Sequence, residues 1–144
     1  MENNNGVTEK QKGSTVEYVY RHTEHEKLEI KSTSVEGRID NGLRHISSES
    51  GNGVKLRFEI PLQFKLGTHN WVRNDNTGIR VYLDPSSIFP GHGEWMGAWG
   101  EFKILDDDFR KFRGEFTVYS KTSGSTTPPR LERGHFLVTF PDQG

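Results

Sequence analysis

The sequence predicts a single all-β domain, on three observations. One alanine, Ala98, and two methionines occur in 144 residues, so the residues that favour helices most are nearly missing. Apolar side chains occupy every second position from Val54 to Leu66, which is the period of a strand with one buried face. Turn signals recur about every ten residues after Thr15, a spacing typical of a sandwich or a barrel.

The first choice of architecture is an antiparallel β-barrel of about eight strands, because closing the sheet removes edges that no helix here could cover. A two-sheet β-sandwich is the second choice. The expected outline is similar to that of the calycins, although no motif in this chain carries that comparison. Residues 1–14 are polar and aperiodic and predict a flexible tail, which leaves residues 15–144 as the single barrel domain.

Pro61 interrupts the longest alternating segment. Proline cannot donate to a strand ladder, so we expect a bend, a bulge or an edge position at this point. On the same pattern Phe58 lies on the buried face, and Lys55 and Arg57 lie on the outward face. The strongest hairpin signal in the chain is Asn41-Gly42, because both residues readily adopt the positive φ angles of a type I′ turn.

The last third of the chain repeats a short pattern three times. Gly100, Gly114 and Gly134 each precede a phenylalanine by two positions, and a β-branched residue follows two positions later. The spacings are unequal, so this is not a solenoid repeat. The pattern predicts a three-stranded meander in which each strand enters the core at its phenylalanine and each glycine makes room for a neighbouring ring or bend.

Several classes of protein are excluded or disfavoured. The chain has no cysteine, which excludes disulfides and zinc–thiolate sites and favours the cytoplasm. No apolar run is long enough for a signal peptide or a membrane span, so no membrane partner is expected. The net charge of −1 gives no overall attraction to nucleic acid. Motifs for nucleotide hydrolysis and serine esterase chemistry are missing.

The segment 89–100 has the most unusual composition, with two indoles, a histidine, a carboxylate and four glycines. Trp95 and Trp99 are four residues apart, so in one strand they would project to the same face. Two interpretations remain open: the rings line an internal pocket for a flat or apolar ligand, or they fill the core. The predicted ligand-binding set is Trp71, Tyr82, Trp95, Trp99 and Phe102.

His92 and Glu94 are the candidate catalytic residues, as an acid and base pair at the mouth of that pocket. The spacing is a weak signal, because no third residue can be assigned to orient the imidazole. The alternative is that both are solvated loop residues.

No metal and no cofactor are expected. The cluster from His22 to Glu26 contains potential ligands, but His22 and His25 would point to opposite faces of a strand. The run Asp106 to Asp108 lacks the alternating ligands of a calcium loop and is followed by basic residues. A solvated turn and a turn with local ion pairs are the expected structures.

Three functions from different classes remain. The first is a small-molecule-binding barrel for an apolar or aromatic ligand. Such a barrel could also have a cofactor-free isomerase or cyclase activity that uses one acid or base residue. The second is an interaction module that recognises protein or carbohydrate through aromatic loops around Trp71, Phe89 and Trp95. The third is a single-stranded nucleic-acid binder that uses basic residues of the long strand, which the twenty acidic residues disfavour. Whether the protein is an enzyme and whether it forms a homodimer stay open.

Overall fold

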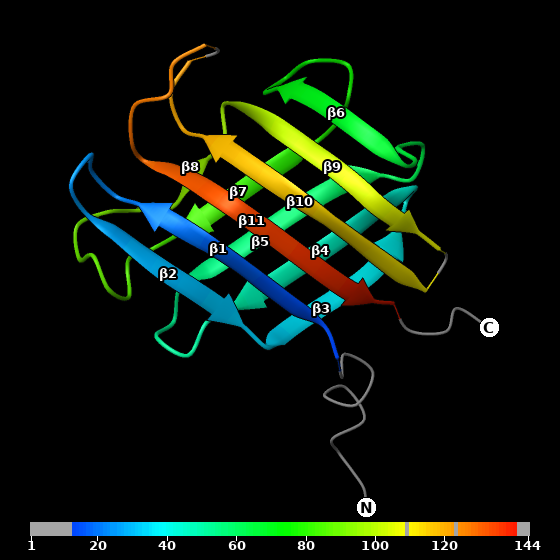
Figure 1. The fold of residues 1–144 in the computed structure, drawn as a ribbon, viewed down its shortest axis with the longest axis horizontal. Coiled ribbons are helices and arrows are strands. Elements are labelled where there is room, and N and C mark those ends of the chain that lie inside the picture. Colours follow the sequence, from blue (N-terminus) through cyan, green and yellow to red (C-terminus); the bar gives the residue numbers. More distant parts are fainter. Residues whose placement is uncertain (1–12, 109, 123, 141–144) are drawn as a thin grey trace, which may run out of the picture.

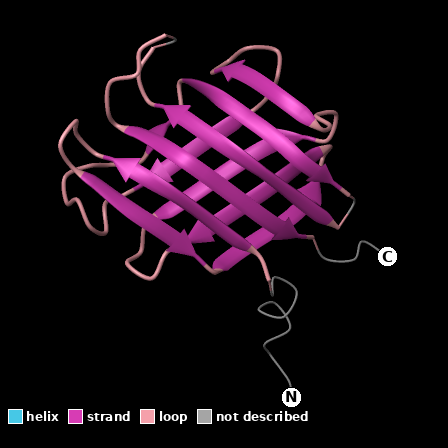
Figure 2. Cartoon of the chain, viewed as in Figure 1, coloured by secondary structure: helices cyan, strands magenta, loops and turns pink. Residues whose placement is uncertain are grey.

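The computed structural model describes residues 13–108, 110–122 and 124–140, and these form eleven strands in two antiparallel sheets (Figure 2). No helix occurs in the described part of the chain, as the shortage of helix-favouring residues predicts. The strands are β1 (Thr15–Arg21), β2 (Lys27–Ser32), β3 (Ser34–Asp40), β4 (Leu43–Glu49), β5 (Lys55–Pro61), β6 (Gly67–Val72), β7 (Arg80–Asp84), β8 (Trp95–Met96), β9 (Trp99–Asp107), β10 (Lys111–Tyr119) and β11 (Arg130–Thr139).

The two sheets lie face to face with their strands crossing (Figure 1). The six-stranded sheet has the order β2-β1-β11-β10-β9-β6 and the five-stranded sheet the order β3-β4-β5-β7-β8. The chain changes sheets between β2 and β3, between β5 and β6, between β6 and β7, and at Gly97 and Ala98 between β8 and β9. There the Gly97 N–H donates to the Val81 oxygen of β7, and the Ala98 N–H donates to the Tyr119 oxygen of β10. No strand pairing between described residues closes the sheets into one barrel, so the sandwich fits better than the barrel.

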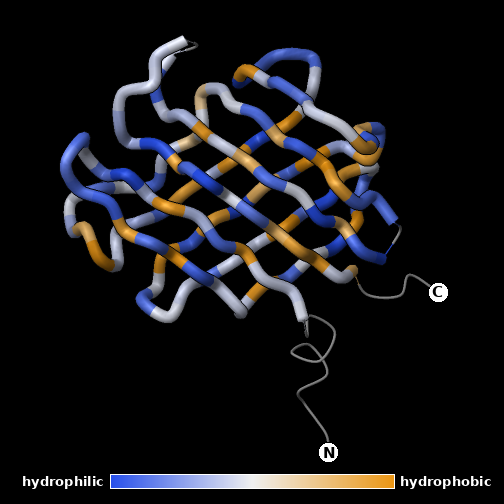
Figure 3. The backbone as a smooth tube through the Cα atoms, viewed as in Figure 1, coloured by the Kyte–Doolittle hydropathy of each residue, from blue (hydrophilic) through white to orange (hydrophobic). Residues whose placement is uncertain are grey.

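Aromatic side chains from both sheets fill the space between them. Phe58 on β5 is 1% exposed, and its ring centroid lies 4.9 Å from that of Phe116 and 5.5 Å from that of Phe102. Along the strands, apolar positions alternate with polar ones (Figure 3), which is the period expected when one face of each sheet is buried. The predicted buried face of residues 54–60 is confirmed, because Val54, Leu56, Phe58 and Ile60 all belong to the core.

The predicted C-terminal meander is confirmed, since β9, β10 and β11 are neighbours in the six-stranded sheet. A Cβ atom on Gly134 would lie 2.5 Å from the ring of Phe116, and one on Gly114 would lie 2.7 Å from the ring of Phe136. Real Cβ atoms do not approach other atoms so closely, so only glycine lets these rings lie against the neighbouring backbone.

The turn at Asn41-Gly42 joins β3 to β4 as predicted, with φ angles of 54° and 75°. The long alternating segment does not continue as one strand through Leu66. The β5 strand ends at Pro61, and the Leu62 N–H then donates to the Gly42 oxygen. Leu66 is 60% exposed, so the alternation of apolar residues in the sequence continues several residues beyond the end of the buried strand at Pro61.

The predicted flexible tail spans residues 1–14, of which residues 1–12 lie outside the described residues. Ser14 is buried, and its hydroxyl accepts a hydrogen bond from the Thr139 N–H at 2.9 Å. Among the described residues, no helix has the length and apolar character to cross a membrane.

Candidate functional site

A groove of about 430 Å³ lies on the outward face of the five-stranded sheet. Its walls come from β3, β4, β5 and β7, and from Glu94 just before β8. The lining is polar because it consists mainly of the residues that alternate with the core positions. It holds three carboxylates (Glu36, Glu49 and Glu94), two cations (Lys55 and Arg57), three hydroxyls (Thr33, Ser34 and Ser47) and the ring of Tyr82. Ser48 also lines it, but its buried hydroxyl donates to the Leu56 oxygen.

Arg57 and Tyr82 are direct neighbours on β5 and β7. The Cζ atom of Arg57 lies 4.2 Å from the centroid of the Tyr82 ring, which is a cation–π contact. This contact occupies one face of the guanidinium and leaves its N–H groups at the edge. Within the described residues, Arg57 makes no hydrogen bond or ion pair, so these donors are available to a ligand.

The carboxylates of the groove are also available. Glu36, Glu49 and Glu94 form no side-chain hydrogen bond or ion pair with any described residue. Acceptors and donors that lack an internal partner must otherwise be satisfied by water or by a bound molecule. The groove therefore presents acceptors and donors side by side on a rigid sheet.

A charged row continues this face one residue pair beyond the groove. His45 on β4 and Glu59 on β5 are direct partners, and His45 Nδ1 lies 3.9 Å from Glu59 Oε2. Arg80 on β7 reaches the other oxygen of Glu59 at 3.7 Å. Because Glu59 has partners on both sides, this row is internally paired, in contrast to the groove.

A second group of side chains gathers at the end of the sandwich where the turn after β1 meets the segment between β7 and β8 (Figure 1). We call Tyr20, His22, Phe89 and His92 the loop-end cluster. The rings of His22 and Phe89 are stacked at 4.3 Å, and the ring of His92 meets His22 edge-on at 4.4 Å. Tyr20 contacts Phe89 edge-on at 5.7 Å.

The two indoles predicted to share a face belong to different sheets. Trp95 lies on β8 of the five-stranded sheet, whereas Trp99 begins β9 of the six-stranded sheet. The parity argument fails because the strand is broken at Gly97 and Ala98, where the chain changes sheets. Trp99 stacks on Tyr119 at 4.2 Å, and its indole N–H donates to the Ser125 oxygen at 3.0 Å.

The structure distributes the predicted site residues over several places. Tyr82 and Glu94 line the groove, and His92 belongs to the loop-end cluster. Trp71 and Phe102 are buried in the core. The acid and base roles of His92 and Glu94 stay predictions. Glu94 lines the groove, whereas His92 belongs to the loop-end cluster.

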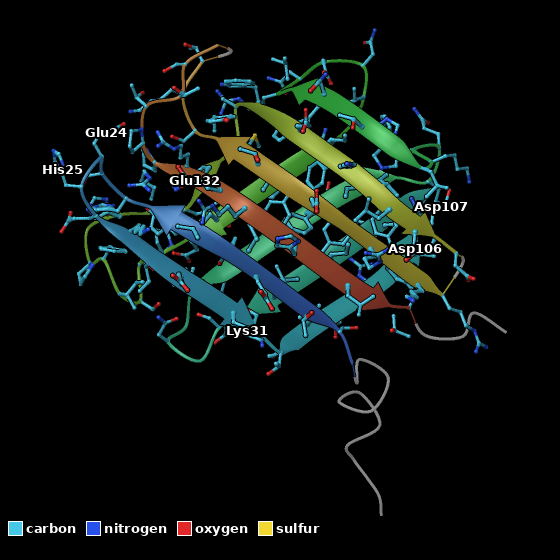
Figure 4. All side chains as sticks on the ribbon, viewed as in Figure 1. Glu24, His25, Lys31, Asp106, Asp107 and Glu132 are labelled. Atoms are coloured by element: carbon cyan, nitrogen blue, oxygen red, sulfur yellow. The ribbon has the colours of Figure 1, made fainter. Side chains whose placement is uncertain are left out.

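The two segments considered for metal binding form ion pairs and turn hydrogen bonds. Glu24 and His25 lie on the turn after β1, and Asp106 lies near the end of β9 (Figure 4). The Glu24 carboxylate lies 3.5 Å from the Arg130 guanidinium at the start of β11. Asp106 accepts a hydrogen bond from Arg113 at 2.7 Å, and the Arg113 guanidinium lowers the pKa of that carboxyl. No group of three or more potential ligands is gathered anywhere in the described ranges.

Sequence reasoning missed Arg57, Glu36 and Glu49 as groove residues. Alternation places Arg57 on the outward face of its strand, but it does not show that this face is hollow or that Glu36 of β3 and Glu49 of β4 line the same hollow. Tyr20 and His22 were likewise not connected with Phe89, which follows them by more than sixty residues. A pairing of distant strands leaves no signal in one sequence.

Comparison with known proteins adds no relative. No family model matches the chain, and no curated protein or solved structure matches it. The function of this chain is therefore inferred from the groove and the loop-end cluster themselves.

Proposed function

We propose that this protein is a binding module that holds a hydroxyl-rich, uncharged ligand, a saccharide, in the groove of the five-stranded sheet. The observation that carries the proposal is the set of unpaired polar groups in one hollow: the carboxylates of Glu36, Glu49 and Glu94 beside the guanidinium of Arg57. A saccharide hydroxyl both donates and accepts, so it satisfies a carboxylate and a guanidinium at once.

The mixed charge of the groove favours an uncharged ligand. An anionic ligand would face the three carboxylates, and a cationic ligand would face Lys55 and Arg57. The lining supplies further hydroxyl groups that can act as donors or acceptors. A volume of about 430 Å³ lies within the range of about 300 to 1,000 Å³ that small-molecule sites occupy.

Tyr82 supports binding by fixing Arg57. A long arginine side chain loses conformational freedom when it binds a ligand, and part of that cost is removed when it already lies over a ring. Both residues extend from strands of one sheet, which is a rigid support for a site.

Of the three functions that the sequence left open, this proposal is the interaction module, with carbohydrate as the partner. The polar lining favours it over the apolar ligand that the indoles suggested, and the site lies on a sheet face, not on aromatic loops. An isomerase or cyclase activity of His92 and Glu94 stays a prediction, as does a cytoplasmic location.

A screen against an array of neutral and acidic oligosaccharides, followed by isothermal titration calorimetry, tests the proposal. We expect a neutral oligosaccharide to bind, and Arg57→Ala and Glu94→Gln each to weaken its binding about tenfold, as the loss of a charge-assisted hydrogen bond predicts. Glu101→Gln, on the exposed face of the other sheet, is the matched control and should bind like the parent. Binding that all three variants retain would place the site elsewhere, and an array that yields only acidic glycans would contradict the charge argument.

A further inference from the structure

The interior beside the loop-end cluster contains buried polar atoms that have no partner. Six such side-chain atoms occur in the described part of the chain, and four of them belong to Tyr18, Tyr20, His22 and Trp95. Tyr18 and Tyr20 are 3% and 1% exposed. Buried polar groups are nearly always hydrogen-bonded, so this concentration at one end of the sandwich requires an explanation.

Three of these side chains follow one another along β1 and the turn after it. Tyr18 and Tyr20 point into the same interior, and the ring centroids of Tyr20 and His22 lie 6.0 Å apart. Burial and, to a smaller extent, the neighbouring Tyr20 raise the pKa of Tyr18. Burial raises the pKa of Tyr20, and the nearby indole of Trp95 partly offsets that rise, although no hydrogen bond of normal geometry joins the two side chains. Both phenols therefore stay protonated at neutral pH and offer O–H donors.

The donor set indicates what would satisfy it. The Trp95 indole can only donate, and a protonated phenol donates one hydrogen bond. A ligand that offers one oxygen acceptor could receive hydrogen bonds from Tyr20 and Trp95 together. None of the four residues of the loop-end cluster is a carboxylate, whereas three carboxylates line the groove.

Phe89 packs against Tyr20 and His22. Its ring is stacked on His22 with 15° between the ring planes, and it meets Tyr20 edge-on. The segment that carries Phe89 makes backbone hydrogen bonds mainly within itself, from the Phe89 N–H to the Pro85 oxygen and from the His92 N–H to the Phe89 oxygen. Its side-chain anchor is Ser87, which donates to the Asn52 oxygen at 2.8 Å. Phe89 can therefore leave without breaking a strand.

We propose that the loop-end cluster, together with Trp95, is a second binding site, for a small phenolic molecule whose oxygen accepts hydrogen bonds from Tyr20 and Trp95 and whose ring replaces Phe89 against His22. In the unliganded protein Phe89 occupies the place of the ligand ring. This inference does not depend on the groove, which is formed by the opposite face of the five-stranded sheet.

The ring contacts explain why a planar ligand fits. Phe89 already forms the stacked and edge-on contacts that an aromatic ligand would repeat with His22 and Tyr20. Phe89 itself carries no oxygen, so it leaves the donors of Tyr20 and Trp95 unsatisfied. A phenol replaces the stacking and adds the missing acceptor.

The test uses 4-nitrophenol, whose binding is followed by tryptophan fluorescence quenching and by the absorbance of its phenolate. Phe89→Ala should bind the probe about tenfold more tightly than the parent, because the competing ring is gone. In that background Tyr20→Phe should weaken binding about tenfold, as the loss of one buried hydrogen bond predicts. Ile88→Ala, which truncates the neighbouring side chain, is the control for loosening of the segment and should bind like the parent.

Three results would overturn the inference. The first is no binding by either the parent or Phe89→Ala, which would leave ordered water as the partner of the buried donors. The second is equal binding by Phe89→Ala and by the double variant that adds Tyr20→Phe. The third is an equal gain from Ile88→Ala and Phe89→Ala. If Phe89→Ala does not fold, as circular dichroism would show, Phe89→Val replaces it with the same expectations.

Discussion

The guanidinium of Arg57 lies over the ring of Tyr82, with 4.2 Å between Cζ and the ring centroid. The two residues are direct partners across β5 and β7, so their contact depends on the register of these strands. In the proposed binding mode the ring holds the guanidinium in place, and the donor groups of Arg57 contact the ligand.

Replacing Tyr82 should therefore separate the contribution of its ring to saccharide binding from the contribution of its hydroxyl. Tyr82→Phe keeps the ring and should leave saccharide binding nearly unchanged. Tyr82→Ala removes a cation–π contact of about 0.5 to 1 kcal/mol and should weaken binding several-fold while the protein stays folded. Calorimetric titration of both variants measures the difference. Equal losses would mean that the phenolic hydroxyl, and not the ring, contributes to the site.

Phe58→Ala should lower the free energy of unfolding by about 3 to 5 kcal/mol, the usual effect of removing a buried ring. Phe58 lies among the rings of Phe102, Phe116 and Phe136 from the opposite sheet, so its loss leaves a cavity between the layers. Lys55→Ala, on the exposed face of the same strand, should change little. Urea denaturation compares the two, and similar losses would contradict the assignment of the buried face.

Gly134→Ala should destabilise the protein by about 1 to 3 kcal/mol, because the added methyl group would overlap the Phe116 ring and force the core to shift. Gly51→Ala is the control, since a Cβ at that position meets nothing within 4 Å. Thermal unfolding followed by circular dichroism measures both. A neutral Gly134→Ala would show that Phe116 can move without cost.

Glu132 should make stability depend on pH in the acid range. Partial burial acts to raise the pKa of its carboxyl, but hydrogen bonds and charges from Arg130 and Arg21 outweigh burial and lower it. A carboxyl whose pKa falls on folding stabilises the protein above its ordinary pKa of about 4.3, and that contribution is lost as the pH falls through the lower, folded value.

Glu132→Gln should therefore be less stable than the parent at neutral pH, and the difference should shrink as the pH falls below about 4.3. Chemical denaturation across this pH range measures it. Glu115→Gln, a more exposed glutamate on β10, is the control. A difference between Glu132→Gln and the parent that stays constant with pH would show that the carboxyl contributes nothing through its charge.

The sequence by itself determined the class of structure and the buried face of its clearest strand. Alternation at residues 54–60 reports the period of the strand backbone, and positive φ angles at Asn41-Gly42 follow from the conformations open to these two residues. The glycines at positions 114 and 134 were also informative, because a missing side chain beside a phenylalanine predicts a close approach. Each of these signals is local.

The tertiary structure alone decided how the strands divide between two sheets and which side chains meet. Trp95 and Trp99 share a parity in the sequence but separate where the chain changes sheets at Gly97 and Ala98. The groove, in turn, joins side chains from four strands, and its hollow depends on their register. Period two gives the face of a residue within its own strand, whereas a site depends on how the strands pair, and pairings such as β5 with β7 or β1 with β11 join segments that no short turn connects.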